Sequence, residues 1–220
     1  MSDKQKHLED LSHIRNLMER SSRFISLSGL SGVFAGIFAL VGAFAALKAM
    51  TGNYQIMSYG NRLPFLVTTD LLFFIVMDAL AVLVLSFSAA VFFTTRKAKK
   101  QGLALWDEKA FRMLVNMAIP LVAGGIFCLI LMYHSLKVPA GSYRIFALIA
   151  PSTLVFYGLA LLNASNYTLD EIKWLGISEI ILGLIACVFL GYGLLFWMLG
   201  FGVLHIVYGF IMWNKYERRR

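Results

Sequence analysis

The sequence is poor in charged residues and rich in apolar ones. Charged residues make up 15% of its 220 positions, and hydrophobic residues make up 59%. Soluble domains are about 25% charged and about 45–50% apolar. The scarcity of charge excludes a soluble globular domain, and the abundance of apolar residues excludes a disordered chain. The composition therefore predicts an integral membrane protein that contacts the lipid bilayer.

Residues that hold disulfides, metals or phosphates are also scarce. The two cysteines, Cys128 and Cys187, lie inside apolar runs, and the chain has four histidines. This pattern excludes a disulfide scaffold and a cysteine-rich metal site. The sequence contains no HExxH motif and no phosphate-binding glycine loop. The leading interpretation therefore includes no metal, no cofactor and no catalytic residue.

A secretory signal peptide is missing as well. Residues 1–23 are polar and charged, whereas a signal peptide has a short basic start followed by an early apolar stretch. We expect the first apolar run to remain in the protein as a membrane anchor. The compact size and the lack of a targeting segment favour a bacterial inner (plasma) membrane.

Six apolar runs have the length of membrane-spanning helices, which need about 20 residues to cross ~30 Å of hydrocarbon. They are Phe24–Leu47, Phe65–Thr94, Phe111–Tyr133, Arg144–Leu162, Ile172–Gly193 and Leu194–Trp213. We predict an all-α bundle of six transmembrane helices, arranged as three hairpins. The last two runs meet at Gly191-Tyr192-Gly193, which we interpret as a tight turn, because one continuous helix would be far too long to span once.

The distribution of positive charge predicts the orientation. With the N-terminus in the cytoplasm, sixteen Lys and Arg residues fall inside and four fall outside, namely Lys48, Arg62, Lys137 and Arg144. The positive-inside rule then places both termini in the cytoplasm, which an even number of spans requires. The same rule explains the net charge of +8, so we expect no nucleic-acid partner.

The chain divides into one membrane domain and two short flanking segments. Residues 1–23 form a basic amphipathic helix with Leu8, Leu11, Ile14, Leu17 and Met18 at helical spacing, residues 24–213 form the membrane domain, and residues 214–220 form a basic tail. Such a helix lies on the inner membrane surface or holds a cytoplasmic protein partner. A surface helix with no further role is the alternative, and the sequence leaves a homo-oligomer open.

The odd-numbered runs share a pattern of small residues. Gly29-x-Ser31 followed by Gly36 recurs as Gly176-x-Ser178 followed by Gly183, and Tyr157-Gly158 parallels Tyr208-Gly209. Gly125 starts a similar stretch in the third run. Three hairpins descended from one unit would explain these matches. Independently of the repeat, Gly29, Gly32 and Gly36 lie on one helical face, and we expect them to pack closely against another helix.

Ionisable residues inside lipid are rare, and they commonly face the interior of a bundle. Asp70 and Asp78 lie in the second run, Glu179 in the fifth and His205 in the sixth. Glu179 is about 9 Å, and His205 about 12 Å, from the cytoplasmic side at 1.5 Å per residue. We expect these two to meet in one cluster with Ser31 and Asn116. Asp78 lies near the midplane, and Asp70 lies near the outer surface.

The motif Gly29-Leu30-Ser31-Gly32 is similar to the GxSG motif of rhomboid intramembrane serine proteases. That resemblance implies a nucleophilic Ser31 paired with a histidine on a later span, for which His205 is the candidate. The match covers four residues and one histidine, and it lies on the first span rather than on a central one. An intramembrane enzyme is therefore the third hypothesis.

The leading hypothesis is that the bundle passes a small ion or solute, with a link to protons. Asp78, Glu179 and His205 are its path candidates, and Asp70, Ser31 and Asn116 are weaker ones. The structural alternative is that Glu179 is protonated or paired with His205 without further function. The second hypothesis is a membrane sensor or scaffold that contacts a cytoplasmic partner through the N-terminal helix.

Overall fold

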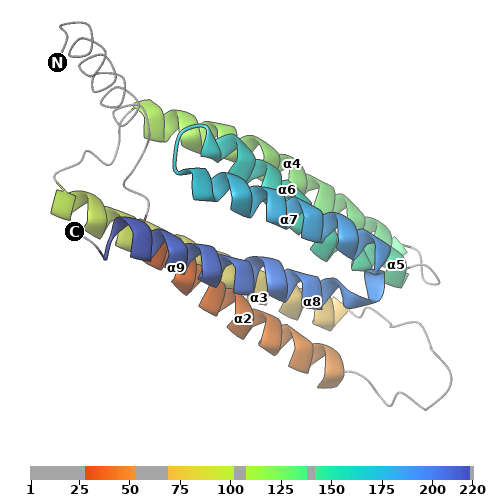
Figure 1. Cartoon of the computed structure of the whole chain (residues 1–220). Helices are drawn as coiled ribbons and strands as arrows, with labels where there is room; N and C mark the ends of the chain where they lie inside the picture. The colour runs from red at the N-terminus through yellow and green to blue at the C-terminus, as the bar shows by residue number, and fades with distance from the viewer. Residues whose placement is uncertain (1–27, 53–68, 102–107, 138–141, 219–220) are drawn as a thin grey trace, which may run out of the picture.

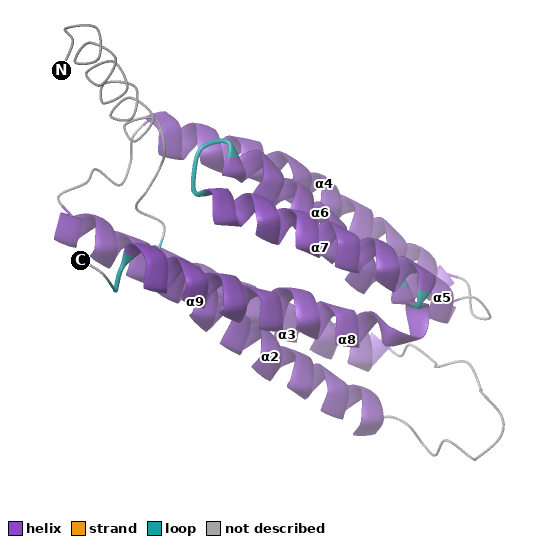
Figure 2. Ribbon diagram, viewed as in Figure 1, coloured by secondary structure: helices purple, strands orange, loops and turns teal. Residues whose placement is uncertain are grey.

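The computed structural model describes residues 28–52, 69–101, 108–137 and 142–218. Figure 2 shows that the regular elements of this part of the chain are helices. Five stretches are long and apolar enough to cross a membrane: Gly29–Thr51, Thr69–Lys100, Ala110–Lys137, Arg144–Ser165 and Leu190–Tyr216. A sixth long helix, α7 (Asp170–Val188), has 19 residues. The chain is an all-α membrane helical bundle, as predicted.

The predicted amphipathic helix at residues 1–23 lies outside the described residues, as do most of the loop between the first two spans and the end of the tail. The spans themselves match the predicted order. They begin with α2 (Gly29–Gly52), α3 (Thr69–Gln101), α4 (Glu108–Lys137), α5 (Ser142–Ala147) and α6 (Ile149–Ser165). After α7 come η1 (Leu190–Tyr192), α8 (Gly193–Trp197), η2 (Met198–Leu204) and α9 (His205–Tyr216).

Two spans are interrupted, each for an identifiable reason. The fourth span is divided into α5 and α6 at Leu148. Pro151 has no N–H to donate to the carbonyl of Ala147, so the regular helical ladder fails there. The sixth span, Leu190–Tyr216, starts with a 3₁₀ turn and contains a π-helical segment, η2, in its middle. The turn at residues 189–193 confirms the predicted break between the last two spans.

The helices form two groups, which Figure 1 shows as two layers. Group A consists of α2 packed against α3 and against α9 with η2. Group B consists of α6 packed against α4 and α7. The sixth span lies at the boundary, since its α8 segment packs on α6 and its η2 segment packs on α2. The residues that touch both groups are therefore those of the sixth span.

Close glycine contacts hold each group together, and they repeat. A Cβ atom added to Gly29 would lie 2.5 Å from the carbonyl oxygen of Gly209, and one added to Gly176 would lie 2.8 Å from that of Gly158. These are the positions that the sequence repeat makes equivalent. Such approaches are possible only without a side chain, and they let helices pack in lipid, where hydrophobicity does not drive helix association.

A second pair of contacts has the same register. A Cβ atom at Gly36 would lie 2.6 Å from the carbonyl oxygen of Gly202, and one at Gly183 would lie 3.0 Å from that of Pro151. The α2–α9 interface and the α7–α6 interface are therefore two copies of one packing arrangement. The close contacts of Gly29 and Gly36 agree with the packing expected of the α2 glycines, and the descent of three hairpins from one unit stays a prediction. The third copy differs, because a Cβ atom at Gly125 would meet no described atom within 4 Å.

Candidate functional site

The carboxylate of Glu179 is the most deeply buried charged group among the described residues. It projects from the middle of α7, and its side chain is 0% exposed. Neither of its oxygens receives a hydrogen bond from any described residue. Gly200 of η2 lies directly against it, so that a Cβ atom there would collide with Oε2. A buried carboxylate without a donor is costly, and proteins seldom retain one without a use.

His205, the first residue of α9, faces Glu179 across the boundary between the two helix groups. Its Nδ1 atom lies 3.4 Å from Oε1 of Glu179 and 3.0 Å from the carbonyl oxygen of Gly200. Its Nε2 atom lies 2.8 Å from the hydroxyl of Tyr157 on α6. The side chain is nearly as buried as that of Glu179. The structure thus confirms the predicted meeting of Glu179 and His205.

The hydrogen-bond pattern fixes where protons reside in this cluster. A carbonyl oxygen only accepts, so Nδ1 of His205 carries a hydrogen and donates it to Gly200. In the neutral ring Nε2 then accepts from the Tyr157 hydroxyl. One additional proton has two places to bind, an oxygen of Glu179 or Nε2 of His205. In the second case the Tyr157 oxygen becomes the acceptor.

Aromatic rings surround the pair. The centroid of Tyr157 lies 4.9 Å from that of Phe201 and 5.3 Å from the His205 ring. Phe201 also stacks on His205, with centroids 5.9 Å apart, and Trp197 lies 4.9 Å from Phe201 on the next turn of the sixth span. The His205 ring, which lies beside the carboxylate, is thus packed against the rings of Tyr157 and Phe201.

The other sequence candidates lie elsewhere. Ser31 donates to the carbonyl of Ser28, 2.5 Å away, and Asn116 donates to Arg112 and to the hydroxyl of Tyr167. Asp78 is partly exposed on α3, where its carboxylate oxygens lie beside Gly42 of α2. Asp70 is exposed in the first turn of α3. Of the expected cluster, the structure therefore brings together Glu179 and His205.

The serine–histidine pairing implied by the GxSG resemblance is not formed. Both ring nitrogens of His205 are engaged, one by Gly200 and one by Tyr157. The Ser31 hydroxyl bonds within its own turn of chain. His205 therefore has no free nitrogen with which to accept the serine proton in this conformation.

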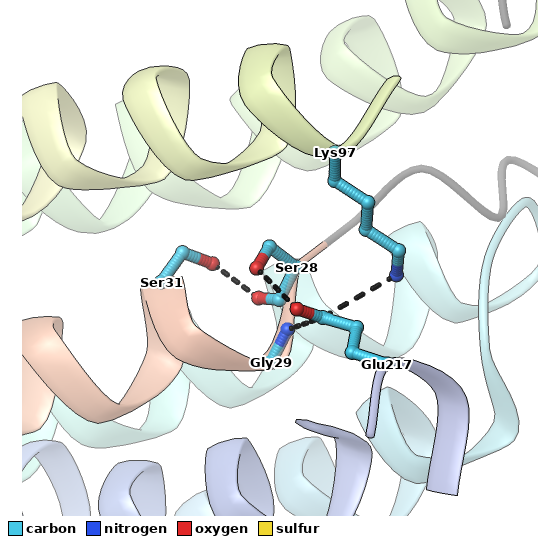
Figure 3. Close-up of polar contacts among 5 residues, drawn as sticks. All are labelled: Ser28, Gly29, Ser31, Lys97 and Glu217. Atoms are coloured by element: carbon cyan, nitrogen blue, oxygen red, sulfur yellow. Dashed lines mark hydrogen bonds and ion pairs between the residues drawn. The ribbon is translucent and has the colours of Figure 1, made fainter. Parts of the chain in front are cut away.

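Two clusters of polar contacts lie at the end of the bundle where α2 begins and α9 ends, here called the terminal end. In the first, shown in Figure 3, Glu217 accepts hydrogen bonds from the hydroxyl of Ser28 and the backbone N–H of Gly29 and pairs with Lys97 of α3 at 3.5 Å. These contacts connect the elements of group A: α2, α3 and the chain after α9.

The second cluster joins the two groups. Glu171 of α7 accepts a hydrogen bond of 2.6 Å from Lys215 and bonds of 3.1 Å from the hydroxyl of Tyr216. Lys215 and Tyr216 belong to α9 in group A, whereas α7 belongs to group B. We call this contact the terminal tie. It lies two helical turns along α7 from Glu179, on the terminal side.

Sequence reasoning missed Tyr157 and Glu217. Tyr157 appeared in the repeat alignment as a neighbour of Gly158, but nothing in its sequence context pairs it with His205. Glu217 lies in a short basic tail, where a single acid gives no signal. Both contacts join residues that are far apart in the chain, and they follow from how the helices pack.

Comparison of this chain with models of known protein families, with curated proteins and with solved structures finds no match. The functional argument therefore rests on the geometry of the site.

Proposed function

We propose that this protein passes a small ion or solute across the membrane, and that the Glu179–His205 pair binds and releases a proton during the cycle. The observation that carries this proposal is the Glu179 carboxylate, fully buried at mid-helix with no hydrogen-bond donor on either oxygen. An idle carboxylate in that position would cost roughly 2.5–3.5 kcal/mol by membrane-insertion scales. In a transport cycle the carboxylate would hold a proton or a solute in turn. It would therefore lack a partner in only part of the cycle.

The position of the pair supports transport. Transporters commonly bind their cargo near the midplane, at the boundary between structural repeats. Glu179 and Tyr157 come from group B, whereas His205 comes from the sixth span, whose η2 and α9 segments pack on α2. Relative movement of the two groups would separate these residues and admit water. A π-helical segment next to them, such as η2, is a frequent feature of functional sites.

The contacts at the two ends of the bundle suggest how such a movement is directed. At the terminal end the groups are held by the exposed tie of Lys215 and Tyr216 to Glu171. At the opposite end the chain itself joins them through the turn at η1, and Gly193 packs against Ala150. The chain also joins the groups at the terminal end, because α3 of group A is followed by α4 of group B after residues 102–107. We expect the tie to restrain opening at the terminal end, which the charge distribution predicts to face the cytoplasm.

The proposal includes no chemical change of the solute, and it places the protein in a plasma membrane with both termini in the cytoplasm. A sensor or scaffold is the competing function. Its evidence lies in residues 1–23, which are outside the described part of the chain.

Water access to the pair tests the proposal. Single cysteines replace Glu179 or His205 in a Cys128→Ala, Cys187→Ala background, and a membrane-impermeant thiol reagent is applied to either side of reconstituted vesicles. A cysteine at Leu184, on the exposed face of α7, is the control that lipid should protect. We expect labelling at 179 and 205 and none at 184. Protection at both sites from both directions would reject transport and favour the sensor or scaffold.

A further inference from the structure

We infer that the solute is an organic cation that competes with a proton for the carboxylate of Glu179. This inference depends on the proposed transport function and names the class of its cargo. It rests on two features: a buried carboxylate whose oxygens receive no hydrogen bond from a described residue, and the rings of Tyr157 and Phe201, which pack on the His205 ring beside that carboxylate.

The carboxylate sets the sign of the ligand. Inside a bundle, a negative charge is stable only if a proton or a cation accompanies it. Among the described residues, no Lys or Arg is paired with Glu179, and His205 directs its Nδ1 hydrogen to Gly200 rather than to the acid. An anionic solute would meet a like charge and no set of donors. The site therefore fits a cation or a proton, and the two exclude one another.

The rings set the kind of cation. Metal cations such as Ca²⁺ or Mg²⁺ require about six oxygen ligands, whereas the described neighbours of the Glu179 carboxylate are Gly200 and the His205 ring. In the described part of the chain, no group of three His, Cys, Asp or Glu side chains is placed to hold a metal. Ring faces attract weakly hydrated organic ammonium or phosphonium ions, which need no coordinating oxygens. Tyr157, Phe201 and Trp197 supply such faces.

The carboxylate of Glu179 and the ring of Phe201 belong to different helix groups. Glu179 and Tyr157 are carried by α7 and α6, and Phe201 by the π-helical segment of the sixth span. Gly200 lies against the carboxylate, so that this part of the sixth span presents no side chain to it. Phe201 packs on His205, which lies beside the carboxylate, so separation of the groups would open a space between the carboxylate and the Phe201 ring. A flat or lipophilic cation then lies between charge and ring.

The exchange balances in atoms and charge. In the proposed cycle, a proton occupies the carboxyl group when no cation is bound. A monovalent organic cation binds as the acid loses its proton to water, so one cation enters for each proton released and no electrons move. Binding should therefore tighten as pH rises until the acid is fully ionised. Below that point each bound cation should release about one proton.

The test is calorimetric titration of the purified full-length protein in detergent with tetraphenylphosphonium and with tetraethylammonium, from pH 5.5 to pH 9. We expect at least one of them to bind, to bind more weakly at low pH, and to acidify a weakly buffered solution. Glu179→Gln should abolish binding, whereas Glu108→Gln, a matched change at an exposed acid on α4, should leave it unchanged. Phe201→Ala should weaken it about tenfold, and Phe201→Tyr should restore it.

The outcomes separate this inference from the proposed function. Binding that is equal in the wild type and in Glu179→Gln would overturn the cation site, as would the failure of a folded wild-type protein to bind either probe. If the cysteines at 179 and 205 are nevertheless labelled from water, transport stands and the cargo is of another class. If they are protected, both proposals fail together. Size-exclusion profiles of each variant establish that it is folded.

Discussion

The carboxylate of Glu217 lies 2.6 Å from the backbone nitrogen of Gly29, so that the last described turn of the chain caps its first described helix. Gly29 is the first residue of α2, and the N–H groups at a helix start have no partner within the helix. An anion is stabilised there by those groups and by the helix dipole. Lys97 of α3 approaches the same carboxylate, and both side chains are largely buried.

Replacing Glu217 should therefore destabilise the bundle. Glu217→Ala removes the acceptor of the Gly29 N–H and the carboxylate that pairs with the Lys97 ammonium. We expect a loss of roughly 2–4 kcal/mol, between the values for a charged hydrogen bond and for a broken buried ion pair. Thermal unfolding in detergent, followed by tryptophan fluorescence, measures the change. Glu108→Ala, whose partner Arg112 lies on the same exposed helix face, serves as the control and should change little. Equal unfolding temperatures for both variants would contradict the capping role.

The terminal tie offers a separate prediction about access. Glu171→Ala removes the acceptor shared by Lys215 and Tyr216, and with it the polar contact between the groups at that end. We expect thiol labelling of a cysteine at position 205 to become several-fold faster from the side that the terminal end faces. The rate from the opposite side should not rise. Arg112→Ala, which removes an ion pair within α4, should leave both rates as they were. Faster labelling from both sides would indicate general loosening rather than a gate.

The glycine contacts predict a graded series. Gly36→Ala places a Cβ atom 2.6 Å from a carbonyl oxygen on the facing helix, and Gly183→Ala places one 3.0 Å from such an oxygen. Overpacking of this kind costs about 1–3 kcal/mol. Gly125→Ala is the matched control, because its Cβ would meet no described atom within 4 Å and alanine favours the helix. Unfolding temperatures should fall for the first two variants and hold or rise for the third. A loss in the third equal to the others would show that its face is covered in the folded protein.

Glu179 itself should be dispensable for stability. Glu179→Met keeps the volume of the side chain and removes a buried, unpartnered carboxylate. We expect the unfolding temperature to stay the same or to rise, because the cost of burying the acid disappears. Binding of the organic cation that the wild-type protein binds should disappear in the same variant. A marked fall in stability would instead identify Glu179 as a structural partner of His205.

The sequence predicted the spans and their order well, because membrane burial leaves a strong signal in composition. It also predicted that Glu179 and His205 meet, since both lie at similar depth in lipid and polar groups there turn inward. Depth alone was insufficient for Ser31, Asn116 and Asp78. Ser31 bonds to the nearby carbonyl of Ser28, Asn116 bonds to Arg112 in its own helix and to the Tyr167 hydroxyl, and Asp78 faces α2. Which face a residue presents depends on helix rotation, and helix rotation is set by packing.

The aromatic part of the site could not be read from the sequence for a related reason. Eighteen phenylalanines and nine tyrosines are present, and most positions on a membrane helix tolerate an aromatic ring. Phe201 lies in the π-helical segment η2, where its ring packs against that of Tyr157. No simple periodicity in the sequence predicts a π-helical segment.

The matching register of the α2–α9 and α7–α6 interfaces has a consequence for the origin of the Glu179–His205 pair. By the register of the repeat, Glu179 occupies in one interface the position that Gly32 occupies in the other, and His205 corresponds in the same way to Leu154. A bundle assembled from identical hairpins would carry every such substitution in each copy, and several buried carboxylates would then repel one another across a few helices. Once the hairpins share one polypeptide, each copy is free to diverge. One interface supplies the acid, the other supplies the base, and the positions left behind remain glycine and leucine.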